Sequence, residues 1–424
     1  MTRRRLLHGL LLVATAATAG TPSPPAAHAG DAPPSPGREA RPPARFTGPR
    51  VGGPRIAALA RFGGDAASER AVVAGLDWLA RHANADGTWD ADGFPARCDG
   101  KGPACDGLGK GQHGEDVPCP FDAPISALAT LAFLGAGHGP WVEGDAHGPL
   151  IGRALEALRG VRDVWGLPLA TQALAEAEVL EGRGRFVEAV RANAERLLAA
   201  RQPDGAWAYA AGFRAGSDVP YTALVVPALV AARDVGVALP ATLAADVDRW
   251  LASLEDDAGR LAYLADGRRY GYTPTAANGL AAAALRGWLE VGRDGKRHRG
   301  HLALAAKDRP DWTIAWKELT VPGRGKVKVQ VGHLSLLEWF LGTEATFEAG
   351  GEAWSGWFAR LRGALVPHQV AKGCARGSWD PLGTYERQTG GRVFATALAV
   401  LMLETPYRRR RLADPVAAPA PRGR

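Results

Sequence analysis

A short turn that recurs along the chain constrains the fold more than any other feature. Its clearest copies are DGTW at residues 86–89, DGAW at 204–207 and GSW at 377–379, and residues 259–263 hold a degenerate copy with Tyr263 in place of Trp. The aromatic residues are separated by about 58 residues or twice that number. Regular self-similarity of this length is typical of a repeat protein. The spacing predicts six units, two of them eroded.

Each unit is predicted to hold two helices of different character. The first is amphipathic, as in Glu69–Ala83 and Arg185–Arg201, where apolar residues recur at intervals of three and four. The second is apolar on all sides, and a helix of that kind is buried on all sides. The six apolar segments are 125–134, 167–180, 221–232, 275–289, 333–341 and 393–403. Six outer and six inner helices in alternation predict an all-α (α/α)6 toroid of six helical hairpins in two concentric layers, closed into a ring.

The recurring turn has a structural explanation. Glycine permits the left-handed backbone that ends a helix, the aspartate accepts a backbone hydrogen bond, and the tryptophan packs on the neighbouring hairpin. We therefore expect the turn tryptophans to hold the hairpins together.

The chain divides into four segments. Residues 1–29 combine an arginine cluster, an apolar stretch and an Ala-x-Ala end, which indicates a signal peptide of the general secretory or the twin-arginine type. Residues 30–65 form a Pro/Gly/Ala-rich linker, residues 66–407 the toroid, and residues 408–424 a basic Pro/Ala tail. No later window is apolar enough for a transmembrane segment. We expect an exported protein, periplasmic or extracellular.

The net charge of +7 and the pI of about 9.4 invite a nucleic-acid function, but the charge is unevenly placed. Residues 1–29 contribute +3 and residues 405–424 contribute +5, which leaves −1 for the body. A nearly neutral body offers no basic face to a phosphate backbone, so no nucleic-acid partner is expected. The arginine run 408–411 is expected to be a solvated tail, with contact to anionic lipid or cell wall as the alternative.

Residues 202–207, QPDGAW, resemble the QW motif of the prenyltransferase and squalene-cyclase (terpenoid cyclase) repeat superfamily. Segments 131–138, 365–369, 377–381 and 390–398 further resemble a group of exported bacterial toroid proteins of unassigned activity. The resemblance covers residues 66–407 and implies the toroid fold. Relatives with this fold include class II terpene cyclases, protein prenyltransferase β subunits and complement-type thioester domains.

Two of the activities that the resemblance brings to mind lack their motifs here. The cyclases use Asp-x-Asp-Asp, and the nearest match, residues 255–257, is expected at the end of an outer helix. The thioester domains use Gly-Cys-Gly-Glu-Gln, whereas residues 373–376 read GCAR.

Three of the four cysteines, Cys98, Cys105 and Cys119, lie in one loop together with His113 and Asp116. These side chains suit zinc, yet their spacing matches no standard zinc finger. Export to an oxidising compartment favours disulfides instead.

We therefore expect two disulfides and no cofactor. Cys98 and Cys105 flank a Gly-rich hairpin, while Cys119 and Cys374 precede the first and last inner helices, which meet where the ring closes. A Cys98–Cys119 bond is one alternative. Zinc is another, and its ligands would be Cys98, Cys105, His113 and Cys119.

If a site exists, we expect it at the mouth of the barrel where the inner helices begin. The catalytic candidates are Asp116, Asp218, Asp380 and Glu386. The ligand-binding candidates are Tyr221, His333, Trp379, Tyr385 and Arg392. Each also has a structural interpretation: Asp218 and Asp122 precede apolar helices and can cap them, Arg392 can pair with Asp380 or Glu386, and His333 can be a core histidine.

Three functions follow from these patterns. The first is a non-catalytic binding or scaffold toroid for an apolar ligand, a peptide or an envelope component, which a barrel filled by its own side chains would favour. The second is an enzyme acting on an isoprenoid or other lipid, which requires an aromatic cavity with a proton donor. The third is a carbohydrate-active enzyme with paired carboxylates, such as Asp116 and Asp380, which fails if those carboxylates only cap helices.

Overall fold

The structure is a computed structural model of the chain. It describes residues 45–411 apart from residues 99, 101–104, 106–120, 210–215, 256–260, 263–274, 294, 306–309, 322–324 and 331–333. Residues 1–41 and 42–424 are separate units, and the second is described below. The predicted signal peptide, residues 30–44 of the predicted linker and most of the basic tail lie outside the described residues.

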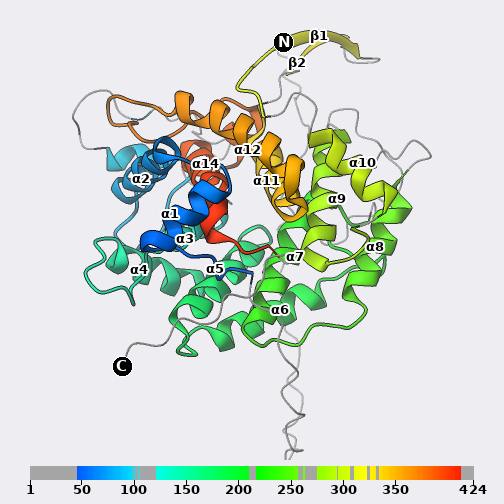
Figure 1. Cartoon of the computed structure of the whole chain (residues 1–424), viewed down its shortest axis with the longest axis horizontal. Coiled ribbons are helices and arrows are strands. Elements are labelled where there is room, and N and C mark those ends of the chain that lie inside the picture. Colours follow the sequence, from blue (N-terminus) through cyan, green and yellow to red (C-terminus); the bar gives the residue numbers. More distant parts are fainter. Residues whose placement is uncertain are drawn as a thin grey trace, which may run out of the picture. The chain divides into compact units, whose positions relative to one another are not determined.

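Twelve of the helices in the described residues form two concentric layers, which confirms the (α/α)6 toroid (Figure 1). The inner helices are α3 (Asp122–Gly135), α5 (Gly166–Glu181), α7 (Val219–Asp234), α9 (Thr275–Leu289), α11 (Leu336–Ala349) and α14 (Gly391–Arg408). The outer helices are α2 (Ala66–Arg81), α4 (Gly148–Leu158), α6 (Val187–Ala199), α8 (Leu243–Leu254), α10 (Lys296–Ala305) and α12 (Gly351–Leu365). Neighbouring inner helices pack side by side, and α14 packs against α3 to close the ring.

The burial of the helices follows the two sequence patterns. The inner helix α14 is buried along its whole length, and α3 is buried from Pro124 to Gly135. The outer helix α8 buries one stripe only, made of Leu243, Val247, Trp250, Leu251 and Leu254. Because an inner helix touches neighbours on every side, it has no polar face, whereas an outer helix keeps one toward water.

The recurring turn is structural, as its composition predicts. The Trp207 indole N–H donates to the Leu197 carbonyl oxygen at 2.6 Å, and its backbone N–H donates to Thr222 Oγ1 at 3.2 Å. The turn is therefore bonded to the outer helix before it and to the inner helix after it. Gly205 has a φ of +99°, where a side chain would be strained. The same pair of bonds joins Trp89 to Leu79 and Ser126, and Trp379 to Leu365 and Thr396.

The expectation that residues 30–65 form only a linker is wrong for residues 45–62, which we call the strap. Its Phe46 is completely buried, and α1 (Gly52–Arg61) packs against α14. The strap covers the end of the barrel at which the inner helices finish, here called the lower mouth (Figure 1). Proline and glycine obscure this role in the sequence, because the strap is anchored by a single phenylalanine and by arginines.

The expectation of a solvated tail from residue 408 is also wrong at its first two positions. Arg408 and Arg409 are fully buried and face acidic side chains of the inner helices. The Glu176 carboxylate of α5 forms ion pairs with Arg50 of the strap and with Arg408, at nitrogen–oxygen distances of 2.7 and 2.9 Å. Burial acts to raise the pKa of Glu176, but the charges of Arg408 and Arg50 outweigh it and hold that pKa below its ordinary value.

A second ion pair of the same kind lies beside the first. Glu348 of α11 binds Arg45 of the strap at 2.7 Å and Arg409 at 2.9 Å. Arg45 is the first described residue and Arg409 is near the last, so Glu348 joins the start of the described chain to its end. The lower mouth is therefore closed by charge pairs that have been removed from water.

Some elements differ from the predictions or were not predicted. The inner helix expected at His333–Leu341 runs instead over Leu336–Ala349, because its polar residues are accommodated inside the ring. The antiparallel strands β1 (Trp316–Val321) and β2 (Gly325–Gln330), the short helix α13 (Thr384–Thr389), and the 3-10 turns η1 (Phe94–Arg97) and η2 (Val366–His368) were not predicted. Among the described helices, none is both long and apolar enough to cross a membrane.

We predict that Glu176→Gln lowers the free energy of unfolding by about 3–5 kcal/mol, because it leaves two buried arginines without their carboxylate. Glu188→Gln is the matched control, since Glu188 pairs with Arg191 at 2.9 Å on the exposed face of α6. The control should lose less than about 1 kcal/mol. Urea unfolding of both variants measures the difference, and equal losses would contradict a stabilising role for the buried pair.

Candidate functional site

The upper mouth, where the inner helices begin, leads into a small apolar cavity on the barrel axis. Its volume is about 40 Å³, enough for roughly three water molecules. The only polar residue among its described lining is Thr389. The other lining residues are Phe121, Pro124, Ile125, Leu128, Trp165, Leu169, Leu224, Leu337, Phe340, Phe394 and Leu398. Large side chains from five inner helices therefore fill this end of the barrel.

The candidate Asp218 caps α7. Its Oδ1 accepts from the Tyr221 backbone N–H at 2.8 Å, and the residue is 1% exposed. Burial raises the pKa of Asp218 to about 7. The raised pKa thus comes from a buried helix cap, and the side chain does not line the axial cavity.

The candidates Glu386 and Asp380 also have structural partners. Glu386 is buried, and its Oε1 accepts from the Leu336 backbone N–H at 2.6 Å, so it ties α13 to the start of α11. Burial raises the pKa of this carboxyl. Asp380 forms an ion pair with Arg392 at 2.6 Å, and Arg392 also donates to Ser378 Oγ at 2.9 Å. Asp116, the remaining catalytic candidate, lies outside the described residues.

The ligand-binding candidates are used in packing where their side chains are described. The Tyr221 hydroxyl donates to the Val164 carbonyl oxygen at 2.8 Å, and its ring meets Trp165 edge-on. Trp379 is the buried tryptophan of the third turn, and Arg392 is buried beside Asp380. Tyr385 belongs to α13, and His333 lies outside the described residues.

Asp122, another residue expected at the barrel mouth and interpreted as a helix cap, binds a loop instead. Its Oδ1 accepts from the Ala91 backbone N–H at 2.8 Å, which fastens the loop after the first turn to α3. Burial, with the nearby charges of Asp90 and Asp92, raises the pKa of Asp122 to about 6. The Asp122 carboxyl is therefore engaged with this loop, and Asp122 is not among the described lining residues of the axial cavity.

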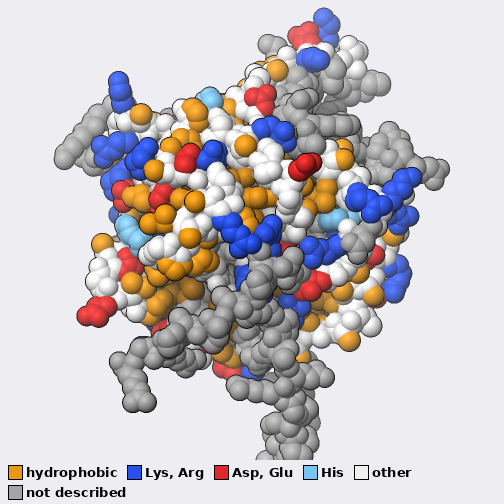
Figure 2. All heavy atoms as spheres, viewed as in Figure 1, with side chains coloured by type: hydrophobic (Ala, Val, Ile, Leu, Met, Phe, Trp, Pro, Cys, Tyr) orange, Lys and Arg blue, Asp and Glu red, His pale blue; other side chains and the backbone are white. Residues whose placement is uncertain are grey.

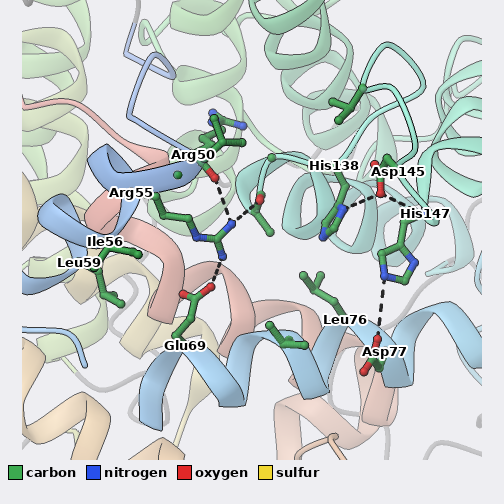
Figure 3. A pocket seen from close by; sticks show the side chains of 16 residues that line it. Arg50, Arg55, Ile56, Leu59, Glu69, Leu76, Asp77, His138, Asp145 and His147 are labelled. Atoms are coloured by element: carbon green, nitrogen blue, oxygen red, sulfur yellow. Dashed lines mark hydrogen bonds and ion pairs between the residues drawn. The ribbon is translucent and has the colours of Figure 1, made fainter. Parts of the chain in front are cut away.

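A much larger depression lies beside the strap, and we call it the groove (Figure 3). Its volume is about 620 Å³, and its walls come from the strap, from α2 and from residues 136–147 between α3 and α4. Four of its apolar residues are unusually accessible: Val51 at 67%, Ile56 at 68%, Val73 at 50% and Val142 at 37% exposed. They are four of the six large hydrophobic residues found exposed in the described part of the chain. Figure 2 shows hydrophobic side chains at the surface over α1 and α2.

Charged groups stand at the two ends of the groove. At one end, Arg55 pairs with Glu69 and donates to the Tyr407 hydroxyl at 3.1 Å. At the other end, shown in Figure 3, Asp145 Oδ1 lies 2.9 Å from His138 Nδ1, and His147 Nε2 lies 3.9 Å from Asp77.

The pKa shifts at the histidine end have identifiable causes. Burial acts to raise the pKa of Asp145, but its hydrogen bonds to His138 and to two backbone N–H groups outweigh burial and lower it. Burial, helped by the charge of His138, lowers the pKa of His147. Both shifts favour an ionised Asp145 beside a neutral His147. The groove was not predicted from the sequence because six of its sixteen lining residues belong to the strap, which has the composition of a linker.

Three cysteines and one histidine converge at the closure of the ring. The Nε2 atom of His82 lies 3.4 Å from Cys105 Sγ, 3.5 Å from Cys374 Sγ and 3.7 Å from Cys98 Sγ. All four donor atoms lie within 4.8 Å of one another. Cys374 thus meets the loop of the first repeat, as expected from ring closure.

Cys98 and Cys105 have free thiols in the described part of the structure, so the predicted disulfide between them is not formed. The other predicted disulfide, Cys119–Cys374, includes a residue outside the described ranges. His113 and Cys119 lie outside the described residues. His82 was missed, although its position at the end of the first outer helix, sixteen residues before Cys98, is a signal that the sequence offers.

No family model matches the chain, and no curated protein matches it. Solved structures do. An inactive variant of the α-1,6-mannanase GH76A of Salegentibacter sp. HEL1_6, in complex with α-1,6-mannotriose, is 10% identical, with a TM-score of 0.51 over 80% of this chain and 99% of the mannanase. A variant of the type II terpene cyclase MstE from Scytonema, in complex with merosterolic acid A, is 13% identical, with a TM-score of 0.47 over 80% of this chain and 97% of the cyclase. A family 76 glycoside hydrolase from Bacteroides thetaiotaomicron is 10% identical, with a TM-score of 0.46 over 80% and 97%.

At these identities the similarity concerns the fold. The chain has the (α/α)6 toroid fold, as its resemblance to the terpenoid-cyclase repeat superfamily implied. Because unrelated chemistries share this fold, function has to be argued from the site.

We predict opposite pH dependences for two aspartates that both cap helices. The pKa of Asp218 is raised from 3.8 to about 7 in the folded state. Between these two pH values the folded state keeps a proton that the unfolded state has released, so the free energy of unfolding falls as pH rises from about 4 to about 7. The gain from Asp218→Asn should therefore grow from pH 4 to pH 7.

Asp65 caps α2, and hydrogen bonds from Ser68 lower its pKa. Its contribution is present above its ordinary pKa and is lost as pH falls, so the cost of Asp65→Asn should shrink on acidification. Thermal unfolding of both variants and the parent chain across pH tests this contrast. Parallel profiles for the two variants would contradict the assignment.

Proposed function

We propose that the protein is an exported, non-catalytic binding or scaffold toroid that holds an apolar segment of a partner polypeptide in the groove. The proposal rests on the concentration of exposed apolar side chains in the groove, namely Val51, Ile56, Val73 and Val142. Soluble surfaces rarely gather such residues without a binding role. Export remains the expectation drawn from residues 1–29.

The state of the barrel axis supports a role without catalysis. The axial cavity has room for a few water molecules, whereas a sugar ring or an isoprenoid chain needs several hundred cubic ångströms. No carboxyl group is among its described lining residues, so no proton donor reaches it from them. Asp218, Glu386 and Asp380 serve instead as helix caps or ion-pair partners.

The openness of the groove favours a polypeptide segment over a small molecule that is engulfed. Val51 and Ile56 are about two-thirds exposed and stand on the rim, so the walls do not enclose a ligand. A hydrocarbon chain left half in water gains little from such contact, because the gain scales with the apolar area removed from water. A partner polypeptide lying over the groove shields the contact from water with its own backbone and places successive apolar side chains on Val73 and Val142.

Pairs of acidic and basic side chains lie at the two ends of the apolar part of the groove. The Arg55–Glu69 pair marks one end and the Asp145–His138 pair the other. Such an arrangement, with an apolar centre and a polar rim, is the usual anatomy of a protein–protein contact.

We predict that Val73→Lys weakens peptide binding about tenfold or more, because it places a charge in the apolar centre of the groove. Val164→Lys is the matched control, since Val164 is 38% exposed but does not line the groove. The probe is a set of fluorescein-labelled synthetic peptides that alternate leucine and serine and differ in length, measured by fluorescence anisotropy on the mature chain.

Two results would contradict the proposal. One is the absence of binding to any peptide of the set. The other is an equal loss of binding in the control variant. Turnover of a polyprenyl diphosphate or of a mannan by the purified chain would instead favour the isoprenoid-enzyme or the carbohydrate-enzyme alternative.

A further inference from the structure

We propose that His82, Cys98, Cys105 and Cys374 form a structural zinc site that joins the first helical hairpin of the ring to the last. This inference is independent of the groove and of the proposed function. It differs from both expectations drawn from the sequence, since neither the disulfide pairs nor the alternative zinc set included His82.

The three distances from His82 Nε2 to the cysteine sulfurs are close to those of a tetrahedral zinc site. Zinc lies about 2.3 Å from a thiolate sulfur and about 2.0–2.1 Å from an imidazole nitrogen, so tetrahedral angles separate a ligand nitrogen from each sulfur by about 3.5 Å. The three separations from His82 Nε2 are 3.4, 3.5 and 3.7 Å. A disulfide would instead bring two sulfurs to about 2.05 Å.

The imidazole of His82 is held in the orientation that a zinc ligand needs. Its Nδ1 lies 2.9 Å from the Trp78 carbonyl oxygen, which places the ring proton on Nδ1 and leaves the lone pair of Nε2 directed at the three sulfurs. The ring stacks on Trp78 at 4.3 Å between centroids. The tautomer and the ring plane are thus both fixed by the helix that carries the histidine.

The cysteines have surroundings that suit thiolates bound to a metal. The backbone N–H of Cys105 donates to Cys98 Sγ at 3.1 Å, a bond that stabilises negative charge on that sulfur. His82, Cys105 and Cys374 are buried, and Cys98 is partly buried. Three thiolates gathered in such a place repel one another unless a cation lies between them.

The location of the site explains what the metal would do. His82 ends α2, and Cys98 and Cys105 follow η1 in the first repeat, whereas Cys374 precedes the turn of the last repeat. His82 and Cys374 are 292 residues apart in the chain. Four protein ligands leave no open position for a substrate, so the site is structural and ties the seam of the ring.

The test measures metal and thiols on the mature chain purified from its exported form. We expect about one zinc ion per chain by elemental analysis, a denatured intact mass with four free thiols, and a lower unfolding temperature after treatment with a zinc chelator. Replacement of zinc by cobalt should give the strong visible absorption of tetrahedral thiolate ligation.

Two cysteine variants separate the proposed ligand set from the earlier one. Cys374→Ala should lower the zinc content at least tenfold, while Cys119→Ala should keep it, because Cys119 is not one of the four proposed ligands. If Cys374→Ala does not fold, the zinc content and thiol count of the parent chain still decide the question. A parent chain that is four hydrogens light and free of metal would overturn the proposal. So would iron or copper in place of zinc, or zinc that is lost in Cys119→Ala and kept in Cys374→Ala.

Discussion

The strap and the two ends of the ring are held together by one buried carboxylate, that of Glu176, which forms ion pairs with Arg50 and Arg408. Glu176 lies on α5, the inner helix of the second hairpin. One of its partners, Arg50, precedes the first hairpin in the chain, and the other, Arg408, ends the last. A buried carboxylate is costly unless it is paired, and here both partners must be in place. The strap therefore folds with the ring and does not simply lie on it. Once it is fastened, its outer side forms a wall of the groove and its inner side closes the lower mouth.

Ring closure is secured at three levels along the seam between the first and last repeats. At the lower mouth, arginines of the strap and of the end of α14 share acidic partners on the inner helices. In the middle, α14 packs directly on α3 and α2. At the other end of α2, His82 meets Cys374 of the last repeat. A toroid has no free edge only if its first and last repeats meet. The buried ion pairs and the cluster of His82 with three cysteines lie where these repeats meet.

The sequence predicts the parts of the fold that repeat. The Trp207 turn is short, local and regular, and its glycine, aspartate and tryptophan each have one physical role, so the hairpins and their layers follow from periodicity. The strap was missed because Arg50 is read as a linker residue until its partner Glu176 is known, and that partner lies far away in the chain. The same holds for Arg408, which looks like part of a basic tail.

The candidate site was harder to predict because its residues meet only through ring closure. Asp218 lies at the start of α7, and Glu386 bonds to the start of α11, and these backbone hydrogen bonds give both residues a structural role that depends on how the helices begin. His82 belongs to no sequence motif and contacts Cys374 only where the first and last repeats meet. The role of such a residue can be recognised only in the three-dimensional structure.

The strap is an integral part of the toroid, because it closes the lower mouth and leaves the groove as the exposed apolar surface. Hydrogen–deuterium exchange of the protein tests this integration directly. We predict that the amides of α1 and of α14 exchange together, at the slow rate set by global unfolding. Rapid exchange of residues 52–61 while α14 stays protected would show that the strap opens on its own, and would contradict the account.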